Sequence, residues 1–194
     1  MYRKICVTNR KLVEGSFTEQ LKKVAESGCD RILLREKDLS EGEYEALAKE
    51  VLHALAPFQT ECVLHTYADV ALRLGCTALH LPLVSLLAMP EEQKRKFKRL
   101  GASVHSVEEA AAAEEAGADE LIAGHIFATD CKKGLAPRGL SFLHSVCEAV
   151  TIPVYAIGGI TDENEEACIR AGAAGVCRMS WYMRRPAESP KSFR

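Results

Sequence analysis

The chain has 194 residues, of which 47% are hydrophobic and 27% charged, and its formal net charge is −2. This composition is that of one globular domain with enough apolar side chains for a sizeable core, so we expect a single domain over residues 1–194. The nearly balanced charge, without a block of like charges, excludes a surface built to bind nucleic acid.

No segment of the sequence has the character of a membrane span or a secretion signal. Apolar runs stay well short of the about 18 consecutive residues that a spanning helix needs. The opening residues, MYRKICVTNR, lack the apolar core of a signal peptide. The eight cysteines form no C-x-x-C pair and mostly lie within apolar runs. Buried, reduced thiols are typical of cytoplasmic proteins, so we expect a cytoplasmic location and neither disulfides nor a zinc site.

Predicted strands alternate with predicted helices along the whole chain. In chain order, the eight strands lie in KICVTN (4–9), ESGCDRILL (26–34), ECVLH (61–65), RLGCTALHL (73–81), GASVHS (101–106), EAGADELIA (115–123), PVYAIGG (153–159) and RAGAAGVCR (170–178). The helices are predicted near residues 18–27, 42–55, 67–74, 90–100, 107–116, 139–149 and 162–171. Short apolar strands that alternate with helices predict a parallel sheet.

Every second strand is preceded by the same pattern, in which a helix ends, a glycine follows and two small or polar residues precede the apolar run. The glycines are Gly28, Gly75, Gly117 and Gly172, at separations of 47, 42 and 55 residues. Each suits the left-handed position that ends a helix, and each separation is about two βα units. Eight such units predict a small closed (βα)8 barrel, the TIM-barrel form of the α/β class. Two prolines in the tail RRPAESPKSFR predict a short or frayed last helix.

Polar residues are expected to converge at the carboxyl ends of the strands, where active sites of this fold lie. The second strand ends in Arg35, Glu36 and Lys37. Because side chains alternate along a strand, Arg35 and Lys37 point to one face and Glu36 to the other. Two cations at the barrel mouth suit an anionic substrate, although charges at a strand end can also simply meet solvent.

The seventh strand runs into a paired-glycine turn within AIGGITDEN (156–164). Gly158 and Gly159 allow backbone N–H groups to approach an anion closely. Phosphate often binds after strands seven and eight of such barrels, and the eighth strand ends in Met179 and Ser180. The four residues together predict a phosphate site.

The histidines differ in their expected roles. His53 and His144 fall on predicted helices and are interpreted as structural or exposed, and His80, between leucines, as a residue of the barrel interior. His65 and His105 stand at strand ends, where a functional and a structural role are both open. The sequence also leaves open a three-histidine metal cluster across strands three to five. No carboxylate accompanies those strand ends, however, so we expect no metal site.

The segment AGHIFATDCKKGLAPRG (123–139) places His125 at the end of the sixth strand, with Lys132 and Lys133 a few residues later. A neutral imidazole with an ordinary pKa of about 6.5 can accept and return a proton at cellular pH. The lysines could bind a carboxylate or a phosphate. From these residues alone, a reactive histidine and a core histidine beside a polar loop are equally supported.

Several segments, in order, resemble one known group of proteins. LREKDLSEGEYEALAKE (34–50), SVHSVEEAAAAEEAGADELIAGHIFATDCKKGLAPRGL (103–140) and IPVYAIGGI (152–160) are similar to the superfamily of thiamine-phosphate synthases and TenI-type thiazole tautomerases. The resemblance runs from about residue 3 to residue 180. It implies a (βα)8 barrel that acts on thiazole phosphate intermediates of thiamine biosynthesis.

By this resemblance, a synthase joins hydroxymethylpyrimidine pyrophosphate to the thiazole phosphate, releases pyrophosphate, and holds Mg²⁺ with carboxylates after strands three and four. This chain has His65 and Thr66 where the family has Asn-Asp, and Ser85 at the second carboxylate position. Leu33 replaces a glutamine of the same family pattern. Neither expected metal carboxylate therefore remains. The hydroxyl groups that replace them bind this hard cation poorly.

The resemblance therefore points to the tautomerase, an isomerase that aromatises thiazole carboxylate phosphate without a metal or cofactor. A proton leaves ring C2, and one is added at the exocyclic carbon of C5. His125 would be the proton shuttle, and the other roles divide between two groups of residues. Substrate contacts would come from Arg35, Lys37, Ser106, Thr129 and Lys132, and phosphate contacts from Gly158, Gly159, Met179 and Ser180.

Two alternatives remain. One is a thiamine-phosphate synthase that recruits its metal differently. The other is a non-enzymatic, thiazole-phosphate-binding regulatory protein, because a fold does not fix a function. In every case the expected partner is a small-molecule thiazole phosphate, and neither nucleic acid nor a membrane is expected. The sequence leaves open whether the chain forms a homo-oligomer.

Overall fold

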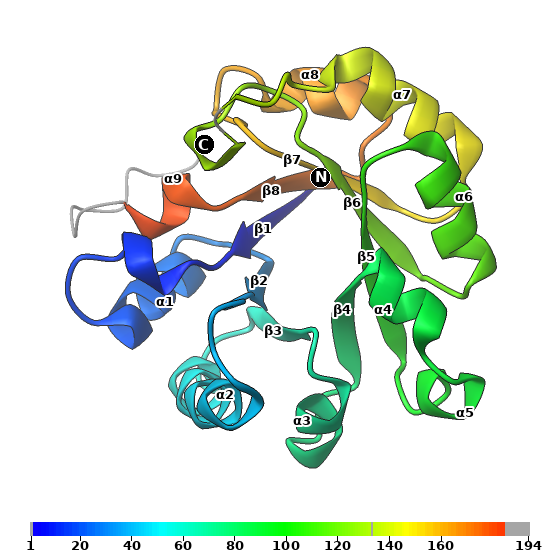
Figure 1. Ribbon diagram of the computed structural model, residues 1–194. Helices are drawn as coiled ribbons and strands as arrows, with labels where there is room; N and C mark the ends of the chain where they lie inside the picture. The colour runs from blue at the N-terminus through cyan, green and yellow to red at the C-terminus, as the bar shows by residue number, and fades with distance from the viewer. Residues whose placement is uncertain (1, 133, 185–194) are drawn as a thin grey trace.

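The computed structural model describes residues 2–132 and 134–184. Eight parallel strands close into a barrel in which each strand pairs with its neighbours in the chain and β1 pairs with β8 (Figure 1). The strands are β1 (Arg3–Val7), β2 (Arg31–Leu34), β3 (Glu61–His65), β4 (Ala78–Pro82), β5 (Arg99–Val104), β6 (Glu120–Gly124), β7 (Val154–Ile157) and β8 (Gly175–Arg178). This closed order confirms the predicted (βα)8 barrel.

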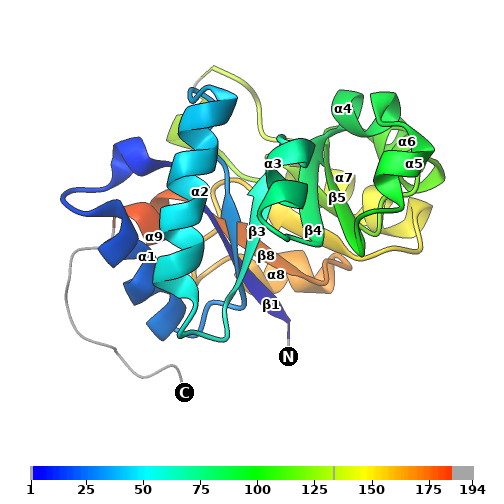
Figure 2. The same ribbon diagram turned by 90° about the horizontal axis from the view of Figure 1, so that it is seen from below.

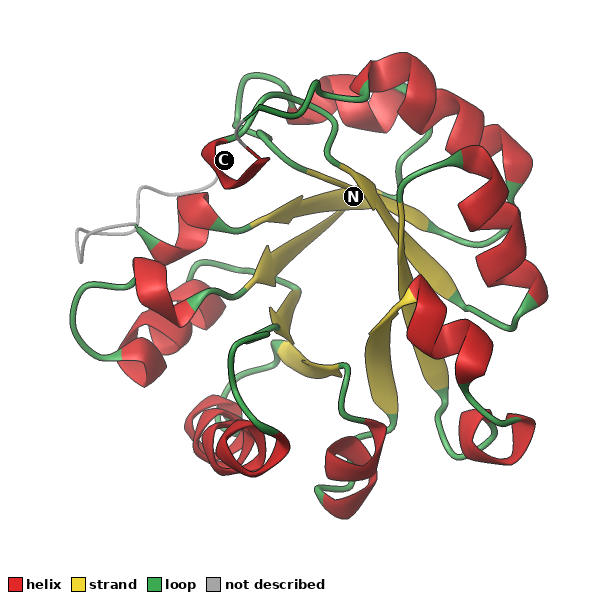
Figure 3. Cartoon of the chain, in the orientation of Figure 1, coloured by secondary structure: helices red, strands yellow, loops and turns green. Residues whose placement is uncertain are grey.

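Helices form an outer layer around the barrel, as the turned view in Figure 2 and the colouring in Figure 3 show. They are α1 (Phe17–Glu26), α2 (Glu41–Leu55), α3 (Ala68–Arg73), α4 (Leu83–Ala88), α5 (Glu91–Lys94), α6 (Val107–Glu115), α7 (Gly139–Ala149), α8 (Glu165–Arg170) and α9 (Ser180–Met183), with 3-10 turns η1 (Arg10–Leu12) and η2 (Asp130–Lys132). Right-handed crossovers pack such helices back onto a parallel sheet. Within the described part of the chain, no helix combines the length and apolar character needed to cross a membrane.

The glycines of the recurring pattern end helices as predicted. Gly28, Gly75, Gly117 and Gly172 have φ angles of 79°, 70°, 87° and 104°. Residues with a side chain rarely adopt this left-handed conformation, whereas glycine does so without a steric penalty. At Gly172 space is also limiting, because a Cβ there would lie 2.9 Å from the Cβ of Cys147. The chain therefore turns from each of these helices into the next apolar strand within a few residues.

Alternation along the strands divides the buried side chains between two cores. Within β2, Ile32 and Leu34 belong to the larger core between the sheet and its helices, whereas Leu33 lies inside the barrel. The barrel interior is filled by Ile5, Val7, Leu33, Val63, Ala78, Ile122, Tyr155 and Cys177. Both faces of each strand are therefore buried, which is why the strands are nearly continuous apolar runs in the sequence.

Charged side chains close the amino end of the barrel. Arg31 lies 2.6 Å from Glu120 and 3.1 Å from Glu61. Arg99 pairs with the same two carboxylates. The Arg31 guanidinium also lies 5.9 Å from the centre of the Tyr155 ring. Arg31 and Glu120 are buried, and buried charges are tolerated when they are paired in this way. The carboxyl ends of the strands are left as the open side of the barrel.

The segment 90–100 differs from the single helix that its pattern predicts. α5 ends at Lys94, and β5 begins at Arg99, two residues before the predicted strand. Phe97, which fits a helical period, is instead buried in the turn between them. The N–H of Arg99 donates to the carbonyl of Thr77 at 3.2 Å, which aligns the new strand beside β4. The helical prediction is wrong here because a turn and a strand, and not one helix face, bury the apolar residues.

Three other helices bear on the predictions. α4 begins directly after β4 and has no counterpart among the predicted helices. α8 starts at Glu165, later than predicted, because residues 161–164 form a turn in which the Asn164 N–H donates to the carbonyl of Thr161 at 3.4 Å. The last helix of the described residues, α9, has four residues, which agrees with the predicted short final helix. The two prolines of the tail lie outside the described residues.

Candidate active site

A cavity of about 850 Å³ opens among the carboxyl ends of the barrel strands. Every strand contributes a lining residue at or just beyond that end, and these include Val7, Arg35, His65, Pro82, His105, His125, Gly158 and Met179. Groups that are far apart in the chain therefore face one open cavity of a size that suits a small organic ligand. This cavity is the candidate active site.

Nine of the ten residues predicted from the sequence line the cavity. They are Arg35, Lys37, His125, Thr129, Lys132, Gly158, Gly159, Met179 and Ser180. Ser106 is not among the lining residues, because its hydroxyl caps the first turn of α6 and accepts a hydrogen bond from the Glu109 N–H at 3.1 Å. The structure therefore brings the predicted anion-binding residues together but gives Ser106 a helix-capping role in place of the expected substrate contact.

The cavity is lined by four cations that have no salt bridge to a carboxylate of the described residues, namely Arg35, Lys37, Lys132 and Arg184. Arg35 and Lys37 follow β2, and Lys132 lies in η2. Burial lowers the pKa of Arg35 below its ordinary value. Burial, followed by the positive charges of Arg35 and Lys132, lowers the pKa of Lys37. Burial therefore destabilises the charged forms relative to water, and a bound anion would relieve both the repulsion and the cost of burial.

A buried carboxylate beside the cavity holds the end of β2 in place. Glu36 is 4% exposed and accepts hydrogen bonds from the Thr8 hydroxyl at 2.7 Å and the Arg10 N–H at 3.0 Å. The Arg10 guanidinium bridges Glu36 and Asp38 at 3.1 and 2.6 Å. The Thr8 hydroxyl in turn accepts from the Arg35 N–H at 2.9 Å. Glu36 does not line the cavity, as the strand alternation predicts. Its hydrogen bonds to Thr8 and Arg10 are a feature that the sequence pattern does not reveal.

The turn after β7 exposes backbone donors to the cavity. Gly158 and Gly159 have φ angles of 104° and 64°, and a Cβ on Gly158 would lie 2.8 Å from the Cα of His125. Glycine is therefore required by both conformation and space. The N–H groups of Gly158, Gly159 and Ile160 donate to no described residue, and Ser180 lines the same cavity. Asn164 braces the turn by donating to the Gly159 carbonyl at 3.0 Å. Free N–H donors around one space suit an anion.

His125 lies on the cavity wall, half-buried, between the main cavity and a side pocket of about 210 Å³. Its Nε2 lies 3.4 Å from the Leu135 carbonyl oxygen. Its backbone carbonyl accepts a hydrogen bond from the Arg138 N–H at 3.0 Å, which ties the end of β6 to the loop before α7. The histidine thus faces the cavity, as the sequence predicts, beside the cation of Lys132. Lys133 lies outside the described residues.

Two buried histidines extend the polar wall into the barrel. Both His65 and His80 are buried, which agrees with the predicted interior position of His80. Burial, the largest cause for each, lowers the pKa of His80 to about 3 and lowers that of His65 well below its ordinary value. His65 Nδ1 lies 2.5 Å from the Thr66 hydroxyl, and His80 Nε2 lies 2.9 Å from the Ser103 hydroxyl. Both rings are neutral hydrogen-bonding groups near pH 7.

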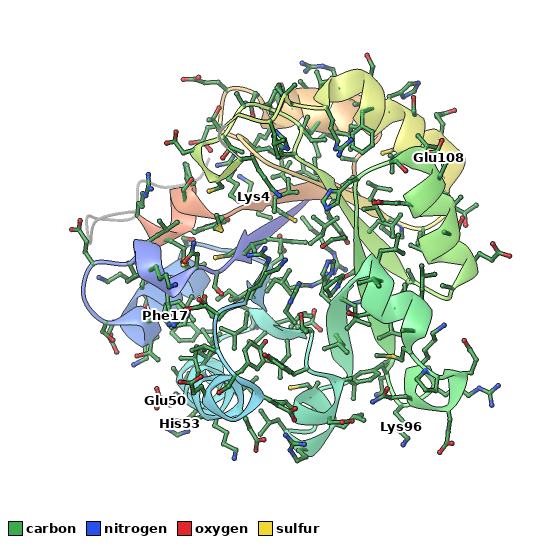
Figure 4. The ribbon with its side chains drawn as sticks, in the orientation of Figure 1. Lys4, Phe17, Glu50, His53, Lys96 and Glu108 are labelled. Atoms are coloured by element: carbon green, nitrogen blue, oxygen red, sulfur yellow. The ribbon has the colours of Figure 1, made fainter. Side chains whose placement is uncertain are left out.

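The other histidines divide between the cavity and the surface. His105 lines the cavity, and its Nδ1 lies 2.8 Å from the carbonyl oxygen of Gly124. His53 on α2 (Figure 4) and His144 on α7 are exposed on outer helices, as predicted. His105 therefore belongs to the wall of the candidate site, whereas His53 and His144 do not.

The described residues of the cavity do not form a metal site. Glu109 is the one carboxylate among the described lining residues, and it accepts a hydrogen bond from the His105 N–H at 2.6 Å. Thr66 and Ser85 stand at the positions where the family resemblance places carboxylates, and Thr66 is paired with His65. Among residues 2–132 and 134–184, no group of three or more histidine, cysteine or carboxylate side chains could hold an ion. The residues present therefore do not fit a protein-held Mg²⁺.

Comparisons with known proteins connect the cavity to an enzyme family. The sequence profile described as thiamine monophosphate synthase matches residues 5–181. A protein of Aquifex aeolicus with the provisional name thiamine-phosphate synthase 2 is 35% identical over 181 residues, which cover 93% of this chain and 97% of that protein. Thiamine-phosphate synthase 2 of Streptococcus pneumoniae is 36% identical over 165 residues, which cover 83% and 77%.

A solved structure agrees with these relatives. The thiamine phosphate pyrophosphorylase of Pyrococcus furiosus matches with a TM-score of 0.80 and 29% identity, over 95% of this chain and 89% of that one. These names contradict the tautomerase, and the isomerase activity, expected from the sequence. The proton shuttling assigned to His125 belonged to that reaction and loses its basis with it. The names support the synthase that stood as the first alternative.

Proposed function

Because the chain belongs to the thiamine monophosphate synthase family, a family of enzymes, we propose that it is a transferase that joins hydroxymethylpyrimidine pyrophosphate to a thiazole phosphate. One observation carries the proposal. The same cavity is lined by two separate groups of anion-binding donors, the cations Arg35, Lys37 and Lys132 and the turn with free N–H groups at Gly158 and Gly159. A reaction between a pyrophosphate ester and a phosphate ester needs two such groups.

The two groups have different tasks in this reaction. The bond between the pyrimidine methylene carbon and the pyrophosphate oxygen breaks, and the leaving oxygen keeps the electron pair while the carbon bonds to the thiazole. Negative charge therefore grows on the leaving pyrophosphate, where Arg35, Lys37 and Lys132 can offset it. The donors after β7 and Ser180 would hold the thiazole phosphate in place, so that the acceptor stays aligned with the reacting carbon.

The described residues of the cavity lack the carboxylates that would hold Mg²⁺, and no other group of them replaces those carboxylates. Charge on the leaving group would be offset by Arg35, Lys37 and Lys132, which line the cavity and have no carboxylate partner among the described residues. Rate dependence on added Mg²⁺ would then reflect a cation that arrives with the pyrophosphate.

The test is a transfer assay with the purified protein, hydroxymethylpyrimidine pyrophosphate and thiazole phosphate, in parallel with Mg²⁺ and with EDTA. Thiamine phosphate and pyrophosphate are expected in equal amounts, and Arg35→Met is expected to lower the rate at least about tenfold, equal to a loss of about 1.4 kcal/mol of transition-state stabilisation. Lys96→Met, which removes an exposed cation after α5 (Figure 4), is the matched control and should leave the rate unchanged.

A second candidate is a protein that binds thiazole phosphate without turnover. It is favoured by one observation, namely that the single carboxylate of the described cavity lining is engaged by a backbone N–H. The same preparation separates the two candidates. Calorimetric binding of thiazole phosphate together with no thiamine phosphate in either assay arm would reject the transferase and support the binding protein.

A further inference from the structure

A buried arginine connects the two segments that carry the candidate phosphate donors. Arg178 is the last residue of β8 and is 4% exposed. Its guanidinium pairs with Asp162 at 2.6 Å and with Glu165 of α8. It also lies 4.9 Å from the centre of the Trp181 ring. One side chain thus contacts the segment after β7, a helix of the outer layer and the segment after β8.

Both partners lie next to residues of the cavity. Asp162 lies three residues after Gly159, in the turn of residues 161–164, and Trp181 directly follows Ser180. Trp181 and Arg178 are themselves among the lining residues. Arg178 therefore contacts both the segment after β7, through Asp162, and the start of α9, through Trp181. A phosphoryl group bound by donors on both segments would require the separation of the two segments to be constant.

The arginine is held firmly from behind by a wider polar cluster. Glu165 is 7% exposed and accepts a hydrogen bond from the Tyr2 hydroxyl at 2.6 Å. It also lies 3.5 Å from Nζ of Lys4, a residue labelled in Figure 4. Glu165 is thereby fixed to β1 and its preceding residue as well as to β8. Arg178 Nε has no hydrogen-bond partner although it is buried.

Packing a strand against a helix through buried charges has a high desolvation cost. Two charges taken out of water cost several kcal/mol each, and an apolar pair of similar volume often stabilises a fold as well or better. Arg31 also has a buried nitrogen without a hydrogen-bond partner, so this cost alone does not distinguish Arg178. What distinguishes Arg178 is its position, because it joins two segments that line one cavity.

We propose that Arg178 is a positioning residue that fixes the separation of the β7 turn and the α9 segment through Asp162 and Trp181, so that one phosphoryl group contacts both. The inference rests on the proposed function, because it assigns the phosphate to these segments. Arg178 acts on the ligand through its neighbours, and it is not proposed as a catalytic residue.

The opposite end of the barrel supplies a matched control. Arg31 is 3% exposed, pairs with the buried Glu120 and lies over Tyr155, just as Arg178 pairs with Glu165 and lies over Trp181. Arg31 does not line the cavity. Arg31→Met and Arg178→Met therefore remove a buried guanidinium from similar surroundings. Both should lower stability, but only the second should change phosphate binding if Arg178 positions the donors.

The experiment measures phosphate binding without turnover. Wild type, Arg178→Met, Arg178→Lys and Arg31→Met are titrated with inorganic phosphate and with thiazole phosphate by calorimetry. We expect Arg178→Met to raise both dissociation constants at least about tenfold. Arg178→Lys should recover part of the loss, because a lysine can still reach Asp162, and Arg31→Met should keep the wild-type constants. In the transfer assay, Arg178→Met should raise KM for thiazole phosphate with little change in kcat.

A spectroscopic signal adds a readout that loss of stability would not produce. Trp181 is the single tryptophan of the chain, so intrinsic fluorescence reports on the contact with Arg178. Phosphate should shift the fluorescence emission of the wild type and of Arg31→Met at similar concentrations. The emission of Arg178→Met should shift only at higher phosphate concentrations, because this variant binds phosphate more weakly.

Several results would overturn the inference. Dissociation constants of Arg178→Met within about twofold of wild type would do so, as would an equal loss in Arg31→Met. If Arg178→Met does not fold, Asp162→Asn decides, because the Asp162 side chain is 62% exposed and its loss leaves the core intact. An unchanged phosphate constant in Asp162→Asn then overturns the inference. Failure of the proposed function is distinct, since it is the absence of thiamine phosphate from a wild type that binds phosphate normally.

Discussion

The imidazole rings of His65 and His80 stack inside the barrel, with centres 5.8 Å apart and planes inclined by 23°. Each ring has a hydroxyl partner, Thr66 for His65 and Ser103 for His80. Two positive rings at this distance would repel each other and the nearby charge of Arg35. The pair is therefore uncharged in the folded protein near pH 7, and His65, which lines the cavity, offers a neutral hydrogen-bonding group beside its cations.

The first prediction concerns acid stability. The pKa of His80 falls to about 3 in the folded protein, mainly through burial, and that of His65 also lies well below its ordinary value. In the unfolded chain both groups regain a pKa of about 6.5. Below that pH the unfolded chain therefore binds protons that the folded protein excludes, so stability is lost as the pH falls. Each histidine contributes a slope of up to about 1.4 kcal/mol per pH unit.

Urea unfolding at several pH values between about 7 and 4 measures this slope. His80→Gln should reduce the change of unfolding free energy per pH unit by the contribution of one histidine. His53→Gln, on the exposed face of α2, should leave this change as it is in the wild type. An acid slope in His80→Gln equal to that of the wild type would show that other groups cause the loss of stability.

The second prediction concerns the turn after β7. Gly158→Ala should destabilise the protein by about 1–3 kcal/mol, because the residue must adopt a positive φ and its Cβ would meet the backbone of His125. The distorted turn should also weaken phosphate binding. Denaturant unfolding and calorimetry measure the two effects. The control is Gly42→Ala on α2, where nothing lies within 4 Å of the added Cβ, and which should be neutral or mildly stabilising.

The third prediction concerns the brace under β2. Glu36→Gln should lower stability by about 1–3 kcal/mol, because the buried acceptor for Thr8 and Arg10 loses its charge. It should also lower activity, since Arg35 and Lys37 depend on this brace for their orientation. Glu50→Gln, an exposed carboxylate on α2 (Figure 4), should change stability by less than about 0.5 kcal/mol. Wild-type activity in a folded Glu36→Gln variant would show that activity does not depend on the contacts of Glu36.

The fourth prediction concerns the cations of the cavity. Pyrophosphate should bind more weakly as the pH rises towards the pKa of Lys37, which burial and the charges of Arg35 and Lys132 lower from its ordinary value. Lys37→Met should bind pyrophosphate at least about tenfold more weakly and should lose this part of the pH dependence. Calorimetry over a pH series tests both statements. An alkaline loss of affinity that persists unchanged in Lys37→Met would point to a different group.

The barrel and most of the cavity residues could be predicted because they depend on local rules. Helix-ending glycines such as Gly28 and Gly172 mark where strands begin, and strand alternation separates Arg35 and Lys37 from Glu36. Once eight strands are counted, the fold itself places their carboxyl ends around one cavity. No contact between distant residues had to be known for these conclusions.

The remaining features depend on which of two possible roles a side chain takes, or on contacts between residues that are distant in the chain. Ser106 stands three residues before Glu109, a spacing typical of helix capping, and the first turn of α6 uses its hydroxyl. The contacts of Arg178 with Asp162 and Glu165 arise only when β8 and α8 pack together, so no sequence pattern indicates them. The tautomerase expectation is wrong because it rests on a few positions such as Thr66 and Ser85, whereas similarity to a protein named as a synthase extends over 93% of the chain.

The amino end of the barrel holds an ion cluster of Arg31, Glu61, Arg99 and Glu120. This cluster also constrains the order in which ligands bind and leave. With that end closed by paired charges, ligands enter and leave by the carboxyl-side opening. A molecule that lies deep, against His65, departs only after whatever covers it has gone. Any two ligands that share this passage must therefore exchange in sequence, and a ligand bound near Lys132 would retain one bound beneath it.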